Sequence, residues 1–196
     1  MKNEVILNGK IVSDFEYNHE MMEEKFYLTY ISVQRSSGTE DKIPVMISEK
    51  LIDPGIKYKN KNVFLYGQYR SRNNQQDDGI HLSLYVFTQH IELLPNSCDH
   101  NEIILEGFIC KKPTFRTTPF GRELSDILLA VPRMYGKSDY IPCICWGRNA
   151  HYSSRLNVGD QVNVKGRIQC RSYEKIIDGI AEDRIAYEIS ATNINI

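Results

Sequence analysis

The chain has 196 residues, of which 41% are hydrophobic and 25% are charged, and its formal net charge is −1. These proportions are typical of globular proteins and exclude a disordered, collagen-like or coiled-coil chain. No apolar run approaches the roughly 18 residues of a membrane span, and the first residues lack the pattern of a secretion signal. Five cysteines without the spacing of a secreted scaffold predict reduced thiols and a cytoplasmic protein.

The predicted elements are β-strands, and they follow the same order in both halves of the chain. Apolar–polar alternation identifies the strands, and one short stretch in each half reads as a helix. In the first half, strands are predicted over 5–11, 27–35, 43–47, 63–67 and 82–86, with a helix over 49–52. In the second half, strands are predicted over 101–107, 124–133, 141–145, 162–166 and 187–189, with a helix over 148–156. Asp-Gly pairs at 78–79 and 178–179 suit tight turns, so the fourth and fifth strands of each half are expected to form a hairpin.

The two halves are an internal repeat. Asn-Glu-Val-Ile-Leu-Asn-Gly at 3–9 matches Asn-Glu-Ile-Ile-Leu-Glu-Gly at 101–107, and later segments match in the same order at a slowly growing offset. Such growth is expected when insertions fall in loops between matched strands. We therefore predict two domains, 1–97 and 98–196. Five strands with a helix between the third and fourth are the layout of an OB-fold, so the predicted fold class is all-β with two tandem OB-folds, each a partly open barrel.

One strand of the second half separates two kinds of side chain. Because successive residues alternate between the faces of a strand, Ile141, Cys143 and Cys145 share one face, whereas Tyr140 and Trp146 share the other. The small apolar set suits a barrel interior. The opposite face then carries two aromatic rings that a core does not need. Exposed rings beside arginines suit single-stranded nucleic acid, because every base has a flat face that stacks on a ring.

Three segments of the second half form a recognisable pattern. Residues 101–107 fit N-x-V-x-L-x-G, and residues 140–147, Tyr-Ile-Pro-Cys-Ile-Cys-Trp-Gly, fit an aromatic, a hydrophobic strand and an aromatic-glycine pair. Residues 156–173 fit L-x-x-G-x-x-V-x-V-x-G-R-L-x-x-R-x-aromatic, which is the most specific match in the chain. In these features the second half resembles the bacterial single-stranded DNA-binding protein family, and it is also similar to primosomal replication proteins of the same fold. The first half matches more weakly, through 3–9 and 67–72.

The resemblance implies a set of binding residues. The family's base-stacking aromatics fall on Tyr140, Trp146 and Tyr173, and its basic position falls on Arg171. Eight of the eleven arginines lie in residues 99–196, and a guanidinium both pairs with phosphate and stacks on bases. Further candidate phosphate contacts are Arg116, Arg133, Arg148 and Arg167. Ordinary core packing is the alternative for Trp146 and Tyr173.

The first repeat departs from the pattern at the three stacking positions. Lys42, Ser48 and Asn74 stand there, and none is aromatic, although the strand apolars and glycines remain. We therefore expect the first domain to have a degenerate binding face and a structural or assembly role. Arg70 and Arg72 leave weak phosphate contact open. An acidic stretch at Glu20 to Glu24 is interpreted as a solvated loop.

Catalytic motifs are missing from the sequence. It has no phosphate-binding G-x-x-x-x-G-K-[ST] loop, no G-x-S-x-G and no H-E-x-x-H. Cys143 and Cys145 lack the second pair that a zinc site needs, so they are expected to be core thiols. We expect no cofactor, no metal and no enzymatic activity.

Two functions from different classes stay open. The first is sequence-nonspecific binding of single-stranded DNA, which protects strands in replication, repair or DNA transfer; RNA remains possible as the ligand. The alternative is an OB-fold protein-interaction module of a replication or primosome complex with weak nucleic-acid binding, and the near-neutral charge favours it. The family commonly assembles four OB-folds, which implies a homodimer here. The chain stops after its last strand without the family's acidic recruitment tip, which points to an accessory member.

Overall fold

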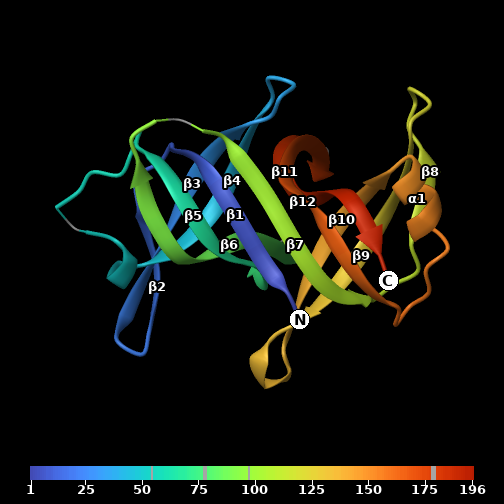
Figure 1. Ribbon diagram of the computed structural model, residues 1–196, viewed down its shortest axis with the longest axis horizontal. Helices are drawn as coiled ribbons and strands as arrows, with labels where there is room; N and C mark the ends of the chain where they lie inside the picture. Colours follow the sequence, from blue (N-terminus) through green and yellow to red (C-terminus); the bar gives the residue numbers. More distant parts are fainter. Residues whose placement is uncertain (54, 77–78, 97, 178–179) are drawn as a thin grey trace.

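The computed structural model describes residues 1–53, 55–76, 79–96, 98–177 and 180–196. Figure 1 shows two β-barrels side by side, one from each half of the chain. Among the described residues, no helix is long and apolar enough to cross a membrane.

The first barrel comprises β1 (Asn3–Ile11), β2 (Glu16–Met21), β3 (Glu24–Gln34), β4 (Glu40–Ser48), the 3₁₀ turn η1 (Glu49–Leu51), β5 (Asn62–Gln76) and β6 (Gly79–Leu94). The second comprises β7 (His100–Ile109), β8 (Thr114–Thr117), β9 (Glu123–Pro132), the 3₁₀ turn η2 (Met134–Gly136), β10 (Ser138–Trp146), α1 (Arg148–Ser153), β11 (Gln161–Ile177) and β12 (Ile180–Asn195).

Each half closes into a barrel in the same way. The strand order is β2-β3-β4-β6-β5-β1 in the first half and β7-β11-β12-β10-β9-β8 in the second, and extra pairings β1–β3 and β7–β9 close the two barrels. The contacts β4–β6 and β10–β12 are parallel, whereas the neighbouring pairs are antiparallel. The short helical segments lie after β4 and β10, between the third and fourth core strands. The prediction of two tandem OB-folds is confirmed.

The structure contains two strands that the sequence does not predict, and β6 and β12 extend well beyond the predicted 82–86 and 187–189. β2 and β8 are additional short strands on the rims, and their residues are mostly exposed and polar, so alternation gives them no signal. The acidic stretch predicted to be a loop is in fact the end of a hairpin. Glu20 lies in β2 and Glu24 begins β3, and only Met22 and Glu23 form the turn, both with positive φ.

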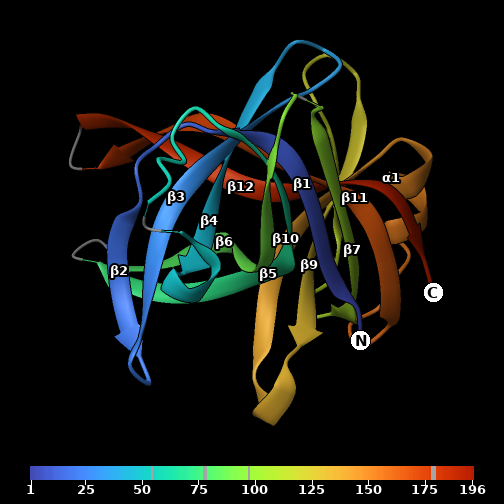
Figure 2. The ribbon, with the colours of Figure 1, turned by 60° about the vertical axis from the view of Figure 1, so that its left-hand side comes forward.

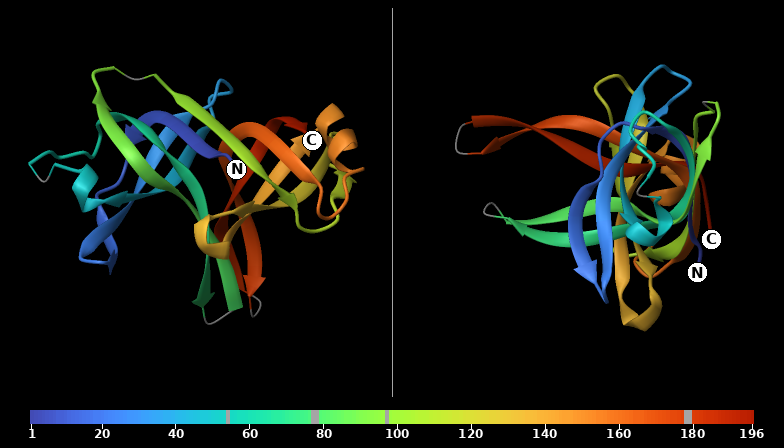
Figure 3. Two further views of the ribbon diagram at one scale, coloured as in Figure 1. Left: turned by 60° about the horizontal axis from the view of Figure 1, so that its bottom comes forward. Right: turned by 90° about the vertical axis from the view of Figure 1, so that its left-hand side faces the viewer.

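The long hairpins β5–β6 and β11–β12 follow the predicted pairing. Their backbones pair antiparallel to Gln76↔Gly79 and Ile177↔Ile180. Of the Asp-Gly turn residues, 78, 178 and 179 lie outside the described part of the chain, and so does residue 97 at the expected domain boundary. In Figure 3 the two hairpins project from the barrels in the same direction and lie beside each other.

Glycine is required where each long hairpin bends around its barrel. The β5–β6 register shifts between Tyr66 and Gly67, and the β11–β12 register shifts between Lys165 and Gly166. A Cβ on Gly67 would lie 2.3 Å from the Phe87 carbonyl oxygen, and one on Gly166 would lie 2.4 Å from that of Ser190. Any larger residue would force the strands apart, because real Cβ atoms do not approach backbone so closely.

The two barrels are joined by β1 and β7, which lie side by side in Figures 1 and 2. The strands pair antiparallel from Asn3↔Leu105 to Asn8↔His100, so the sheet continues from one domain into the other. Val5 pairs with Ile103, its own counterpart in the repeat. The two domains are therefore related by a pseudo-two-fold axis that passes between these residues.

The repeated Asn at the start of each half has a structural explanation. The Asn3 amide donates to the Tyr69 carbonyl and accepts from the Tyr69 N–H, both at 2.8 Å. Asn101 makes the same pair of bonds to Ile168, at 2.7 and 2.9 Å. Each side chain thus replaces a backbone pairing at the point where β1 or β7 leaves its own barrel to join the other.

A buried aspartate in each domain holds the long hairpin of the other domain. In the first clasp, Arg35 donates two hydrogen bonds of 2.6 Å to the carboxylate of Asp41, and the same carboxylate accepts the Cys170 N–H at 2.8 Å. Arg35 also donates to the Cys170 carbonyl at 3.3 Å. Asp41 is fully buried, so these donors compensate for its lost hydration. The first clasp therefore fixes β11 against β4.

The second clasp repeats this arrangement with the domains exchanged. Arg133 donates to both carboxylate oxygens of the buried Asp139 and to the Ser71 carbonyl at 2.9 Å, and the Ser71 N–H donates to Asp139. Arg70 adds a further donor at 3.2 Å. The hydrogen bond to Asp139 raises the pKa of Arg133, which keeps the guanidinium charged. The second clasp therefore fixes β5 against β10.

Candidate nucleic-acid interface

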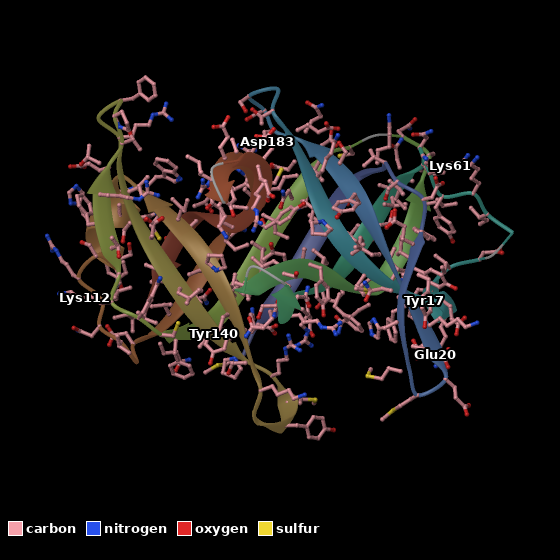
Figure 4. All side chains as sticks on the ribbon, turned by 180° about the vertical axis from the view of Figure 1, so that it is seen from behind. Tyr17, Glu20, Lys61, Lys112, Tyr140 and Asp183 are labelled. Carbon is pink, nitrogen blue, oxygen red and sulfur yellow. The ribbon has the colours of Figure 1, made fainter. Side chains whose placement is uncertain are left out.

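The second-domain face is the outward side of β8, β9 and β10. Along β10, Ile141, Cys143 and Cys145 are buried in the barrel, as alternation predicts. Tyr140 and Trp146 lie on the opposite side; Tyr140 is 46% exposed and Trp146 is half-buried. The two rings are therefore presented on one surface, at opposite ends of the strand. In Figure 4 Tyr140 lies at the base of the β9–β10 hairpin.

A row of three side chains crosses this face at the Trp146 end. Trp146 pairs with Leu124 on β9, and Leu124 pairs with Arg116 on β8. Directly opposed residues in antiparallel strands point to the same side, so the indole and the guanidinium share the face. Arg116 Nε lies 2.6 Å from Asp126 Oδ2, and this hydrogen bond raises the pKa of the arginine. The nearby carboxylate reduces the net positive charge that Arg116 offers a phosphate.

Arg171 and Tyr173 form a cation–ring pair on the β11–β12 hairpin. The Arg171 guanidinium carbon lies 5.8 Å from the centre of the Tyr173 ring, and both side chains are exposed. Arg171 Nε also lies 3.4 Å from a carboxylate oxygen of the buried Glu188. A guanidinium held over a ring presents one flat stacking surface that also carries positive charge.

Arg148 follows Trp146 by two residues at the start of α1. Its side chain is exposed, and no ion-pair partner is found for it within the described ranges. Gly147 has a φ of +52°, which turns the chain sharply between β10 and the helix. Arg148 is therefore an uncompensated cation beside the Trp146 end of the second-domain face.

Two predicted phosphate contacts lie at the seam between the domains and not on the second-domain face. Arg133 belongs to the second clasp, where Asp139 and Ser71 occupy its donors. Arg167 lines a small pocket of about 180 Å³ beside Arg35 and Asp41, and its Nε is buried without a partner among the described residues. The spacing of residues in the sequence does not distinguish an arginine at the domain seam from one on the surface, because both kinds occupy strand positions that match between the repeats. Phosphate contact by Arg133 and Arg167 thus stays a prediction, and the structure places both arginines at the seam.

The first-domain face is the outward side of β3, β4 and β6. At the three positions compared in the sequence it is non-aromatic: Ser48 caps the η1 turn by accepting the Lys50 N–H, and Lys42 and Asn74 are polar. Rings nevertheless reach this face from other strands. Tyr30 on β3 and Tyr85 and Phe87 on β6 lie there, along with Phe26, Leu28, Pro44 and Met46.

The sequence comparison missed these rings because it followed only the family's stacking positions. Their signal was present as the i, i+2, i+4 spacing of Phe26, Leu28 and Tyr30, which alternation assigns to one face of a strand. Phe26 contacts Phe87 with ring centres 5.8 Å apart, and His19 stacks on Phe26 at 5.0 Å. Aromatic residues are thus present on both faces, at different positions in the repeat.

The described residues contain no group of three or more side chains that could hold a metal ion. Cys143 and Cys145 are buried in the second barrel, and burial raises the pKa of the Cys145 thiol to about 11. A thiol with so high a pKa is protonated at neutral pH and is a poor nucleophile. What the site offers chemically is stacking, hydrogen bonding and charge.

A known protein family matches the second domain. The model of the "Single-strand binding protein family" matches residues 100–196, which are the strands β7 to β12 and the helix between them. The second half of this chain is thus similar to the single-strand binding protein family. The residues of the second-domain face and the Arg171–Tyr173 pair all lie inside the matched range.

Individual relatives from the single-strand binding family are similar over part of the chain. The single-stranded DNA-binding protein of Clostridium tetani and single-stranded DNA-binding protein A of Bacillus subtilis are each 35% identical over an alignment of 81 residues that covers 38% of this chain. The aligned part covers 56% and 47% of those proteins. The chain thus spans about half the length of the curated relatives it matches.

A solved structure is similar over nearly the whole chain. The wild-type single-stranded DNA binding protein from Thermus aquaticus superposes with a TM-score of 0.75 at 19% identity, covering 99% of this chain and 92% of that one. A deletion mutant of the same protein gives 0.74 at 20% identity. At this identity the likeness concerns the fold, and it extends the tandem OB architecture to the first half, which the single-strand binding family match does not reach.

Proposed function

We propose that this chain binds single-stranded DNA without strong sequence preference and protects it during replication, repair or DNA transfer. The observation that supports this most is the second-domain face, where Trp146 and Tyr140 lie outward on β10 with Arg116 on the same surface. Bases of any sequence stack on such rings, and arginines neutralise the phosphates between them. The match of residues 100–196 to the single-strand binding family supports the same conclusion.

The binding path is proposed to follow exposed groups of the second domain. It runs from Tyr140 to Trp146 along β10 and uses the Arg171–Tyr173 pair on the hairpin, with Arg148 and Arg116 as phosphate contacts. Arg133 and Arg167 are left out because they lie at the seam. Binding is stoichiometric, without catalysis or a cofactor, and we place it in the cytoplasm.

We also propose a homodimer, which would bring four OB-folds together. The outer side of the sheet formed by β5, β1, β7 and β11 supports this. Ile6 on β1, Ile104 on β7 and Tyr66 on β5 lie there half-buried, amid polar residues such as Glu102. A continuous sheet face shared by both domains suits an isologous contact. Light scattering at micromolar concentration tests it, and a monomeric mass would refute it.

The single tryptophan provides a direct test of DNA binding. Oligothymidine of about 35 nucleotides, long enough for two OB-folds, is titrated into the protein while Trp146 fluorescence is followed. We expect strong quenching that duplex of equal length does not reverse and that added salt weakens. No quenching and no shift in a gel would refute the proposal and favour the interaction-module alternative. Repeating the titration with oligouridine separates DNA from RNA preference.

A further inference from the structure

The strongest unassigned feature is a groove of about 570 Å³ between the first-domain face and the hairpin of the second domain. From the first domain it is lined by β3, β4 and the β5–β6 hairpin, and from the second by the β11–β12 hairpin. Its volume lies within the range of about 300–1,000 Å³ typical of sites for small organic groups. We propose that this composite groove is a second binding subsite, which holds bases of a single strand between rings contributed by both domains. The inference rests on the function proposed above.

Rings line the groove on both sides. Tyr30 on β3 and Tyr85 on β6 come from the first domain, and Tyr173 and Tyr187 come from the second. Tyr30 lies close to Tyr187 across the domain boundary. The Tyr30 phenol therefore adds to the effect of burial in raising the pKa of Tyr187. A tyrosine side chain combines a stacking face with a hydrogen-bonding tip, which suits a base.

The charges in the groove also suit a nucleic-acid strand. Arg72 is exposed on the first-domain side, and within the described ranges it has no ion-pair partner. On the opposite side Arg184 donates to Glu182 at 3.1 Å, and Asp183 is exposed beside them. Figure 4 shows Asp183 on the β11–β12 hairpin, which reaches between the two barrels. Arg72 would contact a phosphate, whereas Asp183 would repel one, so the groove predicts opposite effects of removing the two charges.

The clasps explain why the groove exists only in the two-domain chain. The first clasp fixes Cys170 of β11 against β4, and Tyr187 is the cross-strand partner of Cys170. The second-domain hairpin is therefore held over the first-domain face. A first domain expressed alone would lack the side of the groove that this hairpin forms. The proposal thus revises the expectation that the first domain has only a structural role, because its face is completed by its neighbour.

Affinity measurements on the full chain test the groove. Oligothymidine of about 35 nucleotides is titrated into wild type, Arg72→Ala, Tyr30→Leu and Asp183→Asn, with Arg155→Ala and Tyr152→Leu as matched controls on the α1 side of the second barrel. We expect Arg72→Ala and Tyr30→Leu to weaken binding by about fivefold each and Asp183→Asn to strengthen it by about twofold. The controls should stay at the wild-type value. Circular dichroism confirms that each variant is folded.

The outcomes separate this proposal from the one on which it rests. If wild type binds and the three groove variants all match it, the composite groove is refuted and the second-domain face remains. If wild type fails to bind, both proposals fail. Cross-linking of oligonucleotides that carry 5-iodouracil gives an independent readout. Cross-links in peptides of β3 or β6 together with β12 support the composite groove, whereas cross-links confined to β10 overturn it.

Discussion

The two domains place the same groups at their seam and different groups on their exposed faces. At the seam, Asp41 and Asp139 each bind an arginine fork from their own domain and a backbone N–H from the other. On the faces, the second domain has Trp146 where the first has Ser48, whereas the first has Tyr30 on a different strand. The comparison shows that the buried pairing that joins the domains is nearly symmetrical, while the exposed faces are not.

The largest effect is expected from breaking the second clasp. Asp139→Asn removes the charge that Arg133 and Arg70 share in a buried site, and loss of one partner from a buried ion pair costs about 3–5 kcal/mol. Asp41→Asn should cost somewhat less, because the first clasp has one arginine fewer. Urea unfolding of both variants measures the difference. Asp126→Asn, which breaks the half-exposed pair with Arg116, is the control and should change stability by about 1 kcal/mol or less. Equal, small losses for all three variants would contradict the clasp.

The next effect concerns the indole that distinguishes the two faces. Trp146→Ala should weaken binding of oligothymidine by about 1–3 kcal/mol, because it removes one stacking ring. Ser48→Ala, at the matched position of the first repeat, should leave affinity unchanged. Filter binding or anisotropy with a labelled strand measures both, since the fluorescence of Trp146 itself is lost. If Trp146→Ala binds like wild type, the ring serves the core of the second domain and not its surface.

Salt dependence separates a surface arginine from a seam arginine. Arg148→Ala should reduce the slope of log affinity against log salt by about 0.7, as expected for one lost phosphate contact to a single strand. Arg133→Ala should leave that slope unchanged and lower the stability of the folded chain. Titrations at four salt concentrations, combined with urea unfolding, provide the comparison. The reverse pattern would return Arg133 to the binding surface and remove Arg148 from it.

The smallest effect is a difference in thiol reactivity along the chain. Cys98 is exposed, whereas Cys143 and Cys145 are buried and burial raises the pKa of both thiols, that of Cys145 to about 11. Because burial disfavours the thiolate, the folded state holds these protons more tightly than the unfolded state, whose thiol pKa is about 8.5. Stability is therefore highest below that pH and falls as the pH rises towards the folded value. Burial also keeps the reagent away from Cys143 and Cys145. At pH 8 a thiol reagent should label Cys98 quickly and the buried pair only after unfolding. Mass spectrometry of labelled peptides checks the order. Rapid labelling of Cys143 would show that the second barrel opens readily.

The fold was predictable because its signals are local and repeated. Alternation located each core strand, and the matched Asn-to-Gly segments at 3–9 and 101–107 revealed the repeat. The strands of the long hairpins run well beyond the predicted 82–86 and 187–189, because β6 covers Gly79–Leu94 and β12 covers Ile180–Asn195. β2 and β8 were missed since an exposed polar strand has no apolar face to report it. The helix predicted over 148–156 ends three residues earlier, at Ser153.

The candidate site was only partly predictable because part of it depends on partners distant in the sequence. Tyr140 and Trp146 followed from alternation within one strand. The role of Arg133 depends on Ser71, 62 residues away, and the composite groove depends on two hairpins that meet only after both domains fold. The residue pattern of one β-strand carries no information about such long-range contacts. The position of a residue in a motif therefore predicted its strand and its face better than its partner.

The β1–β7 pairing has a consequence for how this protein can change over time. In a dimer of identical single-domain chains, an isologous strand pairing repeats every substitution on both sides of the axis. Here both partners of the pairing lie on one chain, from Asn3↔Leu105 to Asn8↔His100. A mutation in one half leaves its counterpart untouched. Covalent linkage thus lets natural selection specialise one barrel while the junction that holds both keeps its original form.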